Sequence, residues 1–249
     1  QYGVYRVQYP ESTLGVFANQ ISEQSLNDVD AMGLLDDMFA LVRAGMAPTD
    51  QVLNLATNYS GNTNNAVWDV VATGVGSVQA IFESDEIRAD FDAYMHELIA
   101  VQYTRLGWEK SEGESPFDTL LRPIIVGMSS RYRQPDAIAK SHEKFEEFVN
   151  KKVVIDPNLR GIVYSTAARN GGPEIFDTLL KLHNGTTIAE EKRRYAGALC
   201  SFEDTTQIKR AIDLIRSDHV RIQEAISWVF GLYGNRHARE LIWIWQQEN

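Results

Sequence analysis

Residues 205–233, TTQIKRAIDLIRSDHVRIQEAISWVFGLY, carry the pattern that decides the fold of this chain. Apolar residues recur in this stretch at intervals of three and four, the spacing that places side chains on one face of an α-helix. The first set is Ile208, Ala211, Ile212 and Ile215, and the second is Ile222, Ala225, Ile226 and Val229. The stretch therefore predicts two successive helices, each with one apolar face.

Helix-start signals of several kinds occur elsewhere in the 249 residues. The run Ser115-Pro116-Phe117-Asp118 predicts a helix that ends near Tyr132, because serine is favoured at the N-cap and proline at the first helical position. The pairs Asp156-Pro157 and Gly172-Pro173 repeat this pattern of a cap residue followed by proline. Residues 187–190, TIAE, have the form of a capping box, in which the first and last side chains bond each other's backbone. Each of these sites is expected to begin a helix.

The spacing of the expected helices indicates how they are arranged. One further apolar stripe consists of Ile87, Phe91, Tyr94 and Leu98. Helix boundaries fall about every 15–20 residues, which predicts roughly a dozen helices in pairs of about 35–45 residues. That period is typical of a helix-pair solenoid, whereas a four-helix bundle has fewer and longer helices. The predicted fold class is all-α, a stacked helical array.

Both ends of the chain carry segments that need a partner. Residues 3–9, GVYRVQY, form the one segment with the character of a β-strand, and a lone strand cannot satisfy its own N–H and C=O groups. We therefore expect residues 1–10 to end an upstream β-domain and residues 11–249 to form the helical domain. The last apolar stripe is Ala238, Leu241, Ile242 and Trp245. This apolar stripe also needs a neighbouring helix to cover it. We therefore expect the helical domain to be truncated at its C-terminus.

Composition and charge indicate which kinds of molecule this chain is not expected to bind. The 24 basic and 34 acidic side chains give a net charge of −10, which repels nucleic acid phosphates and anionic lipid. No run approaches the ~20 apolar residues of a membrane span. Nucleic acid and membrane are therefore not expected as partners. The acidic excess lies in residues 1–112, with 5 basic and 16 acidic side chains, and fits either a solvated face or a surface that collects cationic ligands.

The single cysteine, Cys200, indicates the kind of cellular compartment in which the protein is expected. One cysteine cannot form an internal disulfide, which favours a reducing compartment and a cytoplasmic protein. Cys200 lies in an apolar run, so it is expected to be a buried packing residue without a low pKa. Asn58 and Asn184 begin triplets with the form of glycosylation acceptors, but such triplets arise often by chance.

Two patterns suggest a metal site or a catalytic pair, and both are incomplete. His96-Glu97-Leu98-Ile99 begins like the zinc motif HExxH, but Ala100 stands where the second histidine is required. The other histidines, at 142, 183, 219 and 237, have no ligand spacing. Asp36 and Asp37 are adjacent in a predicted helix and point about 100° apart, so they cannot share one proton. They are expected to be solvated or to bond a neighbouring helix end.

Two further patterns have structural explanations. Gly74-Val75-Gly76 lacks the preceding strand and third glycine of a dinucleotide loop, and a close helix contact is expected there. Residues 192–194, KRR, follow Glu190 and Glu191, so ion pairs between successive turns of a solvated helix face are expected. The sequence predicts no catalytic, cofactor-binding or metal-binding residue in this chain.

A family resemblance emerges when several short segments are taken in order. Residues 3–9 resemble the G-x-Y-R-V-x-Y segment that ends the small β-domain of M1 zinc aminopeptidases, and residues 34–45, LLDDMFALVRAG, resemble the helix that follows it. Further similar segments are Val67-Trp68, Arg105-Leu106-Gly107-Trp108, Leu120-Leu121-Arg122, Asp156-Pro157-Asn158-Leu159-Arg160 with Val163-Tyr164, and Glu190-Glu191-Lys192-Arg193-Arg194. They occur in family order over essentially the whole chain and look closest to the puromycin-sensitive, cytosolic branch.

The resemblance implies a HEAT-like α-solenoid that arches over a catalytic domain and closes a peptide-binding chamber. In that family the G-A-M-E-N motif, the zinc helix and the transition-state tyrosine lie upstream of the strand, and none matches a position here. Tyr5 and Tyr9 are strand residues by this comparison. The implied cofactor is zinc in the missing catalytic domain, with none in this chain. The implied partners are that catalytic domain and peptide substrates.

Two functions remain open from the sequence. The first is the non-catalytic C-terminal domain of an M1 aminopeptidase, so that the parent protein is an enzyme and this segment alone is not. The second is a free-standing helical scaffold that binds a protein partner in its groove. The opening strand argues against the scaffold, because an independent solenoid would begin with a polar capping helix.

Overall fold

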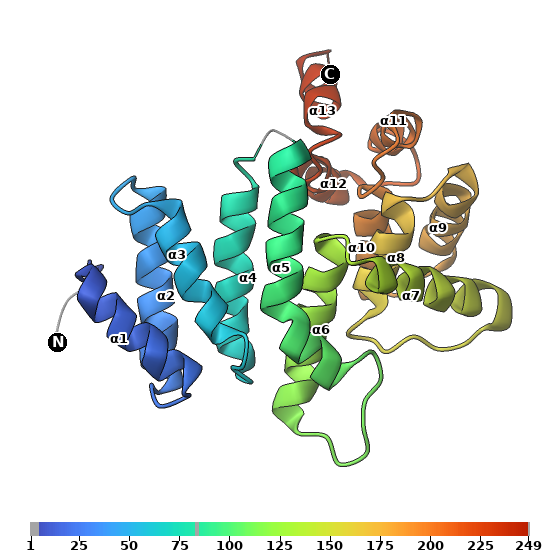
Figure 1. Ribbon diagram of the computed structural model, residues 1–249. Coiled ribbons are helices and arrows are strands. Elements are labelled where there is room, and N and C mark those ends of the chain that lie inside the picture. The colour runs from blue at the N-terminus through green and yellow to red at the C-terminus, as the bar shows by residue number, and fades with distance from the viewer. Residues whose placement is uncertain (1–4, 83–84, 249) are drawn as a thin grey trace. The chain divides into compact units, whose positions relative to one another are not determined.

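The computed structural model describes residues 5–82 and 85–248, and the regular structure within those residues is helical (Figure 1). The chain divides into two compact units, residues 1–134 and residues 135–249. The first unit holds α1 (Glu11–Ser22), α2 (Asp28–Arg43), α3 (Thr49–Ala56), α4 (Asn65–Gln79), α5 (Asp85–Leu106) and α6 (Pro116–Arg131). A 3-10 turn, Thr57–Tyr59, follows α3.

The second unit holds the remaining helices of the described chain. They are α7 (Pro135–Glu146), α8 (Arg160–Arg169), α9 (Pro173–Gly185), α10 (Ala189–Leu199), α11 (Thr205–Leu214), α12 (Ile222–Gly234) and α13 (Arg239–Glu248). A π-helical turn, Glu147–Lys151, follows α7, and Lys152 then takes a left-handed conformation with φ 61°. The all-α class predicted from the sequence is confirmed.

Each unit is built around a row of alternate helices. In the first unit α2 contacts α4 and α4 contacts α6, while α3 packs against α2 and α5 packs against α6. In the second unit α8 contacts α10 and α10 contacts α12, while α7 packs on α8 and α9 on α10. Contact between every second helix is the arrangement of a helix-pair solenoid, in which each pair buries its apolar face against the next.

The core of the first unit is formed by large side chains with almost no exposure. Trp68 and Tyr59 are fully buried, and each uses its polar atom on a backbone carbonyl. The Trp68 Nε1–H donates to the carbonyl of Asn62 at 2.7 Å, and the Tyr59 hydroxyl donates to the carbonyl of Ala31 at 2.8 Å. Because these polar atoms are satisfied, both rings contribute their apolar area without a desolvation penalty.

The predicted helix starts agree with the structure at two sites. α6 begins at Pro116 after the N-cap Ser115, whose hydroxyl accepts the N–H of Phe117 at 3.2 Å. α9 begins at Pro173 after Gly172. The predictions for these two helices are confirmed.

At two other sites a helix follows as predicted, but the predicted cap does not start it. Asp156 accepts the N–H of Asn158 at 2.8 Å, but this bond closes a turn and α8 begins only at Arg160. The capping box at residues 187–190 does not form, because Ile188 is the N-cap of α10 and Thr186 accepts its N–H instead. Short polar side chains stabilise turns as well as helix starts, so the same residue types can indicate either structure.

The apolar stripe predicted for α12 is also wrong. Val229 is buried, but Ile222 is 92% exposed and Ile226 is 57% exposed. The core side of α12 consists instead of Trp228, Val229 and Leu232. α12 is apolar on most of its circumference, so spacing alone does not select the face that packs. By contrast, all four residues of the stripe predicted at 208–215 are buried.

The opening segment, predicted as a strand, is not a strand in the described residues. Residues 5–10 have no regular secondary structure, and residues 3 and 4 of the predicted strand lie outside the described residues. The segment lies along α2, where Val7 donates its N–H to Asp37 Oδ2 at 3.1 Å and the Gln8 side chain donates to the carbonyl of Met46 at 3.2 Å. A segment of irregular structure uses side-chain acceptors when no partner strand is present.

Candidate functional site

Three polar clusters join the segments that carried the family resemblance. The first, the opening clasp, consists of Arg6, Val7, Asp36 and Asp37. Arg6 forms an ion pair with Asp36 and a second with Asp37 at 3.0 Å, and Val7 binds the other oxygen of Asp37. The two carboxylates therefore bond the opening segment, rather than solvent alone or a helix end as predicted. The hydrogen bond that Arg6 donates to Asp36, followed by the one it donates to Asp37, raises the pKa of Arg6.

The second cluster, the loop anchor, is buried. It consists of Glu114, Arg122 and the carbonyl of Leu106, and both charged side chains are only 5% exposed. The Arg122 guanidinium pairs with Glu114 and also donates to the Leu106 carbonyl at 3.2 Å from both Nε and Nη2. The Leu106 carbonyl is at the end of α5 and would otherwise lack a partner. Arg122 thus fastens the α5–α6 loop to both helices.

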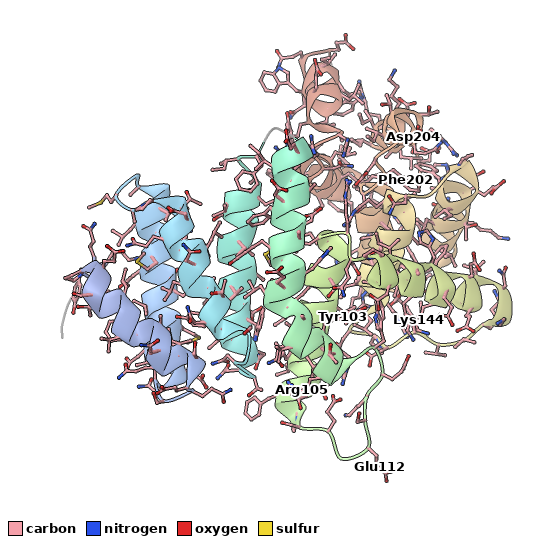
Figure 2. The ribbon with its side chains drawn as sticks, in the orientation of Figure 1. Tyr103, Arg105, Glu112, Lys144, Phe202 and Asp204 are labelled. Carbon is pink, nitrogen blue, oxygen red and sulfur yellow. The ribbon has the colours of Figure 1, made fainter. Side chains whose placement is uncertain are left out.

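The loop anchor lowers the pKa of Glu114. The hydrogen bond from Arg122 is the main cause that lowers the pKa of Glu114 to about 2, with smaller help from Ser111 N–H and Thr119. Figure 2 marks Glu112 at the far tip of this loop, with Tyr103 and Arg105 near the end of α5. At the base of the loop, the Trp108 Nε1–H donates to the Tyr103 hydroxyl at 2.9 Å. The loop is therefore held at its base while its tip extends outward.

The third cluster, the Arg160 network, links α8 to α10. Arg160 donates to Glu191 at 2.8 Å, and Arg194 bonds both Glu191 at 2.5 Å and Glu190 at 2.6 Å. The predicted pairs between successive turns of α10 are therefore present for Arg194. Glu191, however, is buried and bridges two helices, so that side of α10 is not the solvated face that was predicted. Beside it, the rings of Tyr164 and Tyr195 stack at 4.9 Å.

The residues that suggested chemistry are engaged in packing. His96 Nε2 lies 2.6 Å from the carbonyl of Tyr132, and because a carbonyl only accepts, this nitrogen donates and joins α5 to the end of α6. Cys200 is buried, and burial raises the pKa of its thiol to about 12, which keeps it protonated and unreactive. Within residues 5–82 and 85–248, no group of three or more His, Cys, Asp and Glu side chains could hold a metal ion.

The two remaining sequence patterns also find structural explanations. A Cβ at Gly74 would lie 2.1 Å from Phe39 Cδ2, so α4 crosses α2 there as closely as a glycine permits. This confirms the close helix contact predicted for that segment. Asn58 directs its amide to the carbonyls of Asn54 at 3.2 Å and Leu55 at 3.1 Å, and its side-chain oxygen accepts the Ser22 hydroxyl at 2.8 Å. A glycan on this nitrogen would replace those bonds.

Sequence reasoning singled out the charged residues of the clusters except Glu114, but it missed their pairings. Arg6 and Asp37, Glu114 and Arg122, and Arg160 and Glu191 are separated by between 8 and 31 positions, and no local pattern joins them. Opposite charge was the one available signal. In the helices that the structure describes, none is long and apolar enough to span a membrane.

Comparison with known proteins shows which family the chain matches. The ERAP1-like C-terminal domain family matches residues 1–249. Aminopeptidase 2 of Candida albicans is 28% identical over 257 residues, covering 100% of this chain and 27% of that protein. Aminopeptidase M1 of Arabidopsis thaliana is 27% identical (100% of this chain, 29% of that protein), and glutamyl aminopeptidase of Homo sapiens is also 27% identical (99% and 26%).

The chain thus spans between 26% and 29% of the length of these relatives. Its helical architecture and its three motif-bearing clusters extend over both units, as the family match does. The chain belongs to the ERAP1-like C-terminal domain family, and aminopeptidases are among the proteins to which it is similar.

Proposed function

We propose that this chain is the non-catalytic domain of a zinc aminopeptidase of the M1 family, and that it closes the chamber in which peptides reach the metal. The observation that carries the proposal is the family match over residues 1–249, together with aminopeptidase relatives that cover the whole chain. Zinc and bond cleavage belong to the catalytic domain of the same protein, which is the main proposed partner. Peptide substrates are the second.

The contacts of this chain support a non-catalytic role. His96, Cys200 and the Asp36–Asp37 pair are the residue types that could carry chemistry, and each is engaged in a contact that holds helices or the opening segment. A catalytic group needs a free atom directed at substrate. These side chains thus serve to hold helices and the opening segment in place.

The opening segment has a proposed role in the complete protein. Residues 1–10 would form the last strand of an upstream β-domain, where a sheet supplies the backbone partners that a lone strand lacks. The opening clasp would then hold this strand against α2 through Arg6 and Asp37. Residues 11–249 would form the helical domain.

We also propose that the parent protein belongs to the puromycin-sensitive branch and is cytoplasmic. The support is the order of the family segments and the single buried cysteine, which suits a reducing compartment. Inhibition of the parent enzyme by puromycin tests the branch. The aminopeptidase relatives, matched over 99–100% of the chain, favour this function over a free-standing scaffold.

The test compares the isolated chain, the complete parent enzyme and the parent without residues 11–249. We expect no peptide hydrolysis and no stoichiometric zinc from the isolated chain. The parent without the helical domain should still cleave a single-residue chromogenic amide, but should lose its discrimination between short and long peptides. Retained zinc and amide hydrolysis serve as the folding control. Zinc-dependent hydrolysis by the isolated chain, or unchanged length discrimination after the deletion, would contradict the proposal.

A further inference from the structure

One buried histidine is not used by any of the three clusters. His183 lies in the last turn of α9 and is 1% exposed. Its Nδ1 is 3.3 Å from Asn184 Oδ1, and since an amide oxygen only accepts, Nδ1 carries the hydrogen. The neutral ring therefore has its lone pair on Nε2, which is the atom that an added proton would occupy.

This ring links two helices that both contact α10. His183 packs edge-to-face against Trp228 of α12, with ring centroids 5.7 Å apart and an interplanar angle of 89°. α10 contacts both α9 and α12, so the His183–Trp228 pair closes a three-helix contact. Trp228 is itself 2% exposed. A change in the charge of His183 would thus act inside the second unit and not at its surface.

The surroundings of His183 oppose a positive charge more than they favour one. Lys192 of α10 and His219 of the α11–α12 loop repel an imidazolium, whereas Glu224 of α12 and the Asn184 oxygen attract it. The Trp228 ring face also attracts cations. Burial is the largest effect and, with the two repulsive neighbours, lowers the pKa of His183. The carboxylate that could compensate is Glu224, which accepts a bond from Arg221 at Oε1 while its Oε2 is buried without a hydrogen-bond partner. Its attraction is smaller than the effect of burial.

We propose that His183 makes the packing of α12 sensitive to acid, because protonation of its buried ring loosens the contact with Trp228 and releases α12 from α9. The direction follows from proton linkage. Since the folded state binds this proton less readily than the unfolded state, the stabilisation is fully present above the ordinary histidine pKa of about 6.5 and is lost as the pH falls below it. α12 also carries the exposed side chains Ile222 and Ile226, so acid would alter how this apolar surface is presented.

The test measures urea unfolding of the 249-residue chain between about pH 7 and pH 5, around the ordinary histidine pKa. His183→Phe keeps an aromatic ring against Trp228 but cannot titrate. We expect the ratio of folded to unfolded wild-type chain to fall, relative to this variant, by up to about tenfold per pH unit. His142→Gln, which removes a half-buried histidine of α7, is the control for the loss of a histidine outside this contact. Equal pH dependence in wild type and His183→Phe would overturn the proposal.

A second measurement decides the matter if His183→Phe does not fold. In the wild-type chain, NMR follows the ring protons of the histidines, with His183 assigned by comparison with His183→Gln, and the indole N–H of Trp228. We expect His183 to titrate below the ordinary histidine range and Trp228 to shift with the same midpoint. A ring that titrates at or above that range, or a Trp228 signal that does not follow it, would overturn the proposal.

Discussion

At the scale of single residues, Gly74 and Phe39 set the distance between α4 and α2. A Cβ at Gly74 would overlap the Phe39 ring, whereas Gly33 on the exposed side of α2 has nothing within 4 Å of such an atom. The two glycines therefore differ in function although both lie inside helices. One allows close packing, and the other only adds flexibility to the unfolded chain.

These two positions give a matched pair of substitutions. We expect Gly74→Ala to lower the free energy of unfolding by about 1–3 kcal/mol, because the added methyl forces Phe39 or the helix to move. Gly33→Ala should raise it by about 0.5–1 kcal/mol, since alanine is the better helix former. Urea denaturation of the chain and its two variants measures both effects. Equal effects of the two substitutions would show that the approach of α4 to Phe39 is not close.

The loop anchor is a second feature at this scale. We expect Arg122→Met to lower the free energy of unfolding by about 3 kcal/mol, because it leaves Glu114 buried without its charge partner. Arg105→Met is the matched control, since its ion pair with Asp118 is more exposed. It should cost less than about 1 kcal/mol. Thermal and urea unfolding of the two variants provide the measurement.

The charge of Glu114 adds a pH signature to that comparison. Its folded pKa of about 2 lies below the ordinary value of 4.5, so its stabilisation is present above pH 4.5 and is lost as the pH falls toward 2. In Glu114→Gln this part of the acid dependence should be missing. A wild-type and a variant curve that run parallel through this range would argue against a buried ion pair.

At the scale of elements, α8 and α10 are joined through one carboxylate. Glu191 contacts Arg160 of α8 and Arg194 of its own helix, whereas the side chain of Glu190 contacts Arg194 and is 63% exposed. The adjacent positions therefore carry the same charge in different roles. Glu191 holds two helices together, and Glu190 supports one helix from outside.

The two glutamates provide the test at this scale. We expect Glu191→Gln to lower the free energy of unfolding by about 1–3 kcal/mol, because two arginines lose a charged acceptor. Glu190→Gln should change it by less than about 0.5 kcal/mol, as for exposed pairs one helical turn apart. A double-mutant cycle with Arg160→Met separates the contact between helices from the contact within α10. A coupling near zero between positions 160 and 191 would refute the bridging role.

At the scale of the whole molecule, the acidic excess in residues 1–112 is the feature that bears on substrates. If these carboxylates face the proposed chamber, the parent enzyme should cleave peptides with basic tails with a higher kcat/KM than their acidic counterparts. That preference should shrink as salt rises, because exposed charges are screened beyond about 10 Å at 0.1 M salt. Kinetics on matched basic and acidic peptides at increasing salt measure the effect. A preference that does not respond to salt would contradict it.

The sequence was sufficient for the helical class and for several individual helices. α6 and the stripe at 208–215 were predictable because capping and helical spacing are local properties of the chain. Gly74 was predictable for the same reason, since a glycine inside an apolar helix suggests close approach. The ordered family segments indicated the family without any contact being known.

Only the tertiary structure decided which face of α12 packs and which charges meet. Trp228 and Leu232 are buried while Ile222 is exposed, although all three are apolar, because the position of α10 and α13 selects the side. Likewise the pairing of Arg6 with Asp37, or of Arg160 with Glu191, depends on helices brought together from distant positions. Local spacing determines that a segment is helical, but burial is a property of the neighbours that the fold places around it.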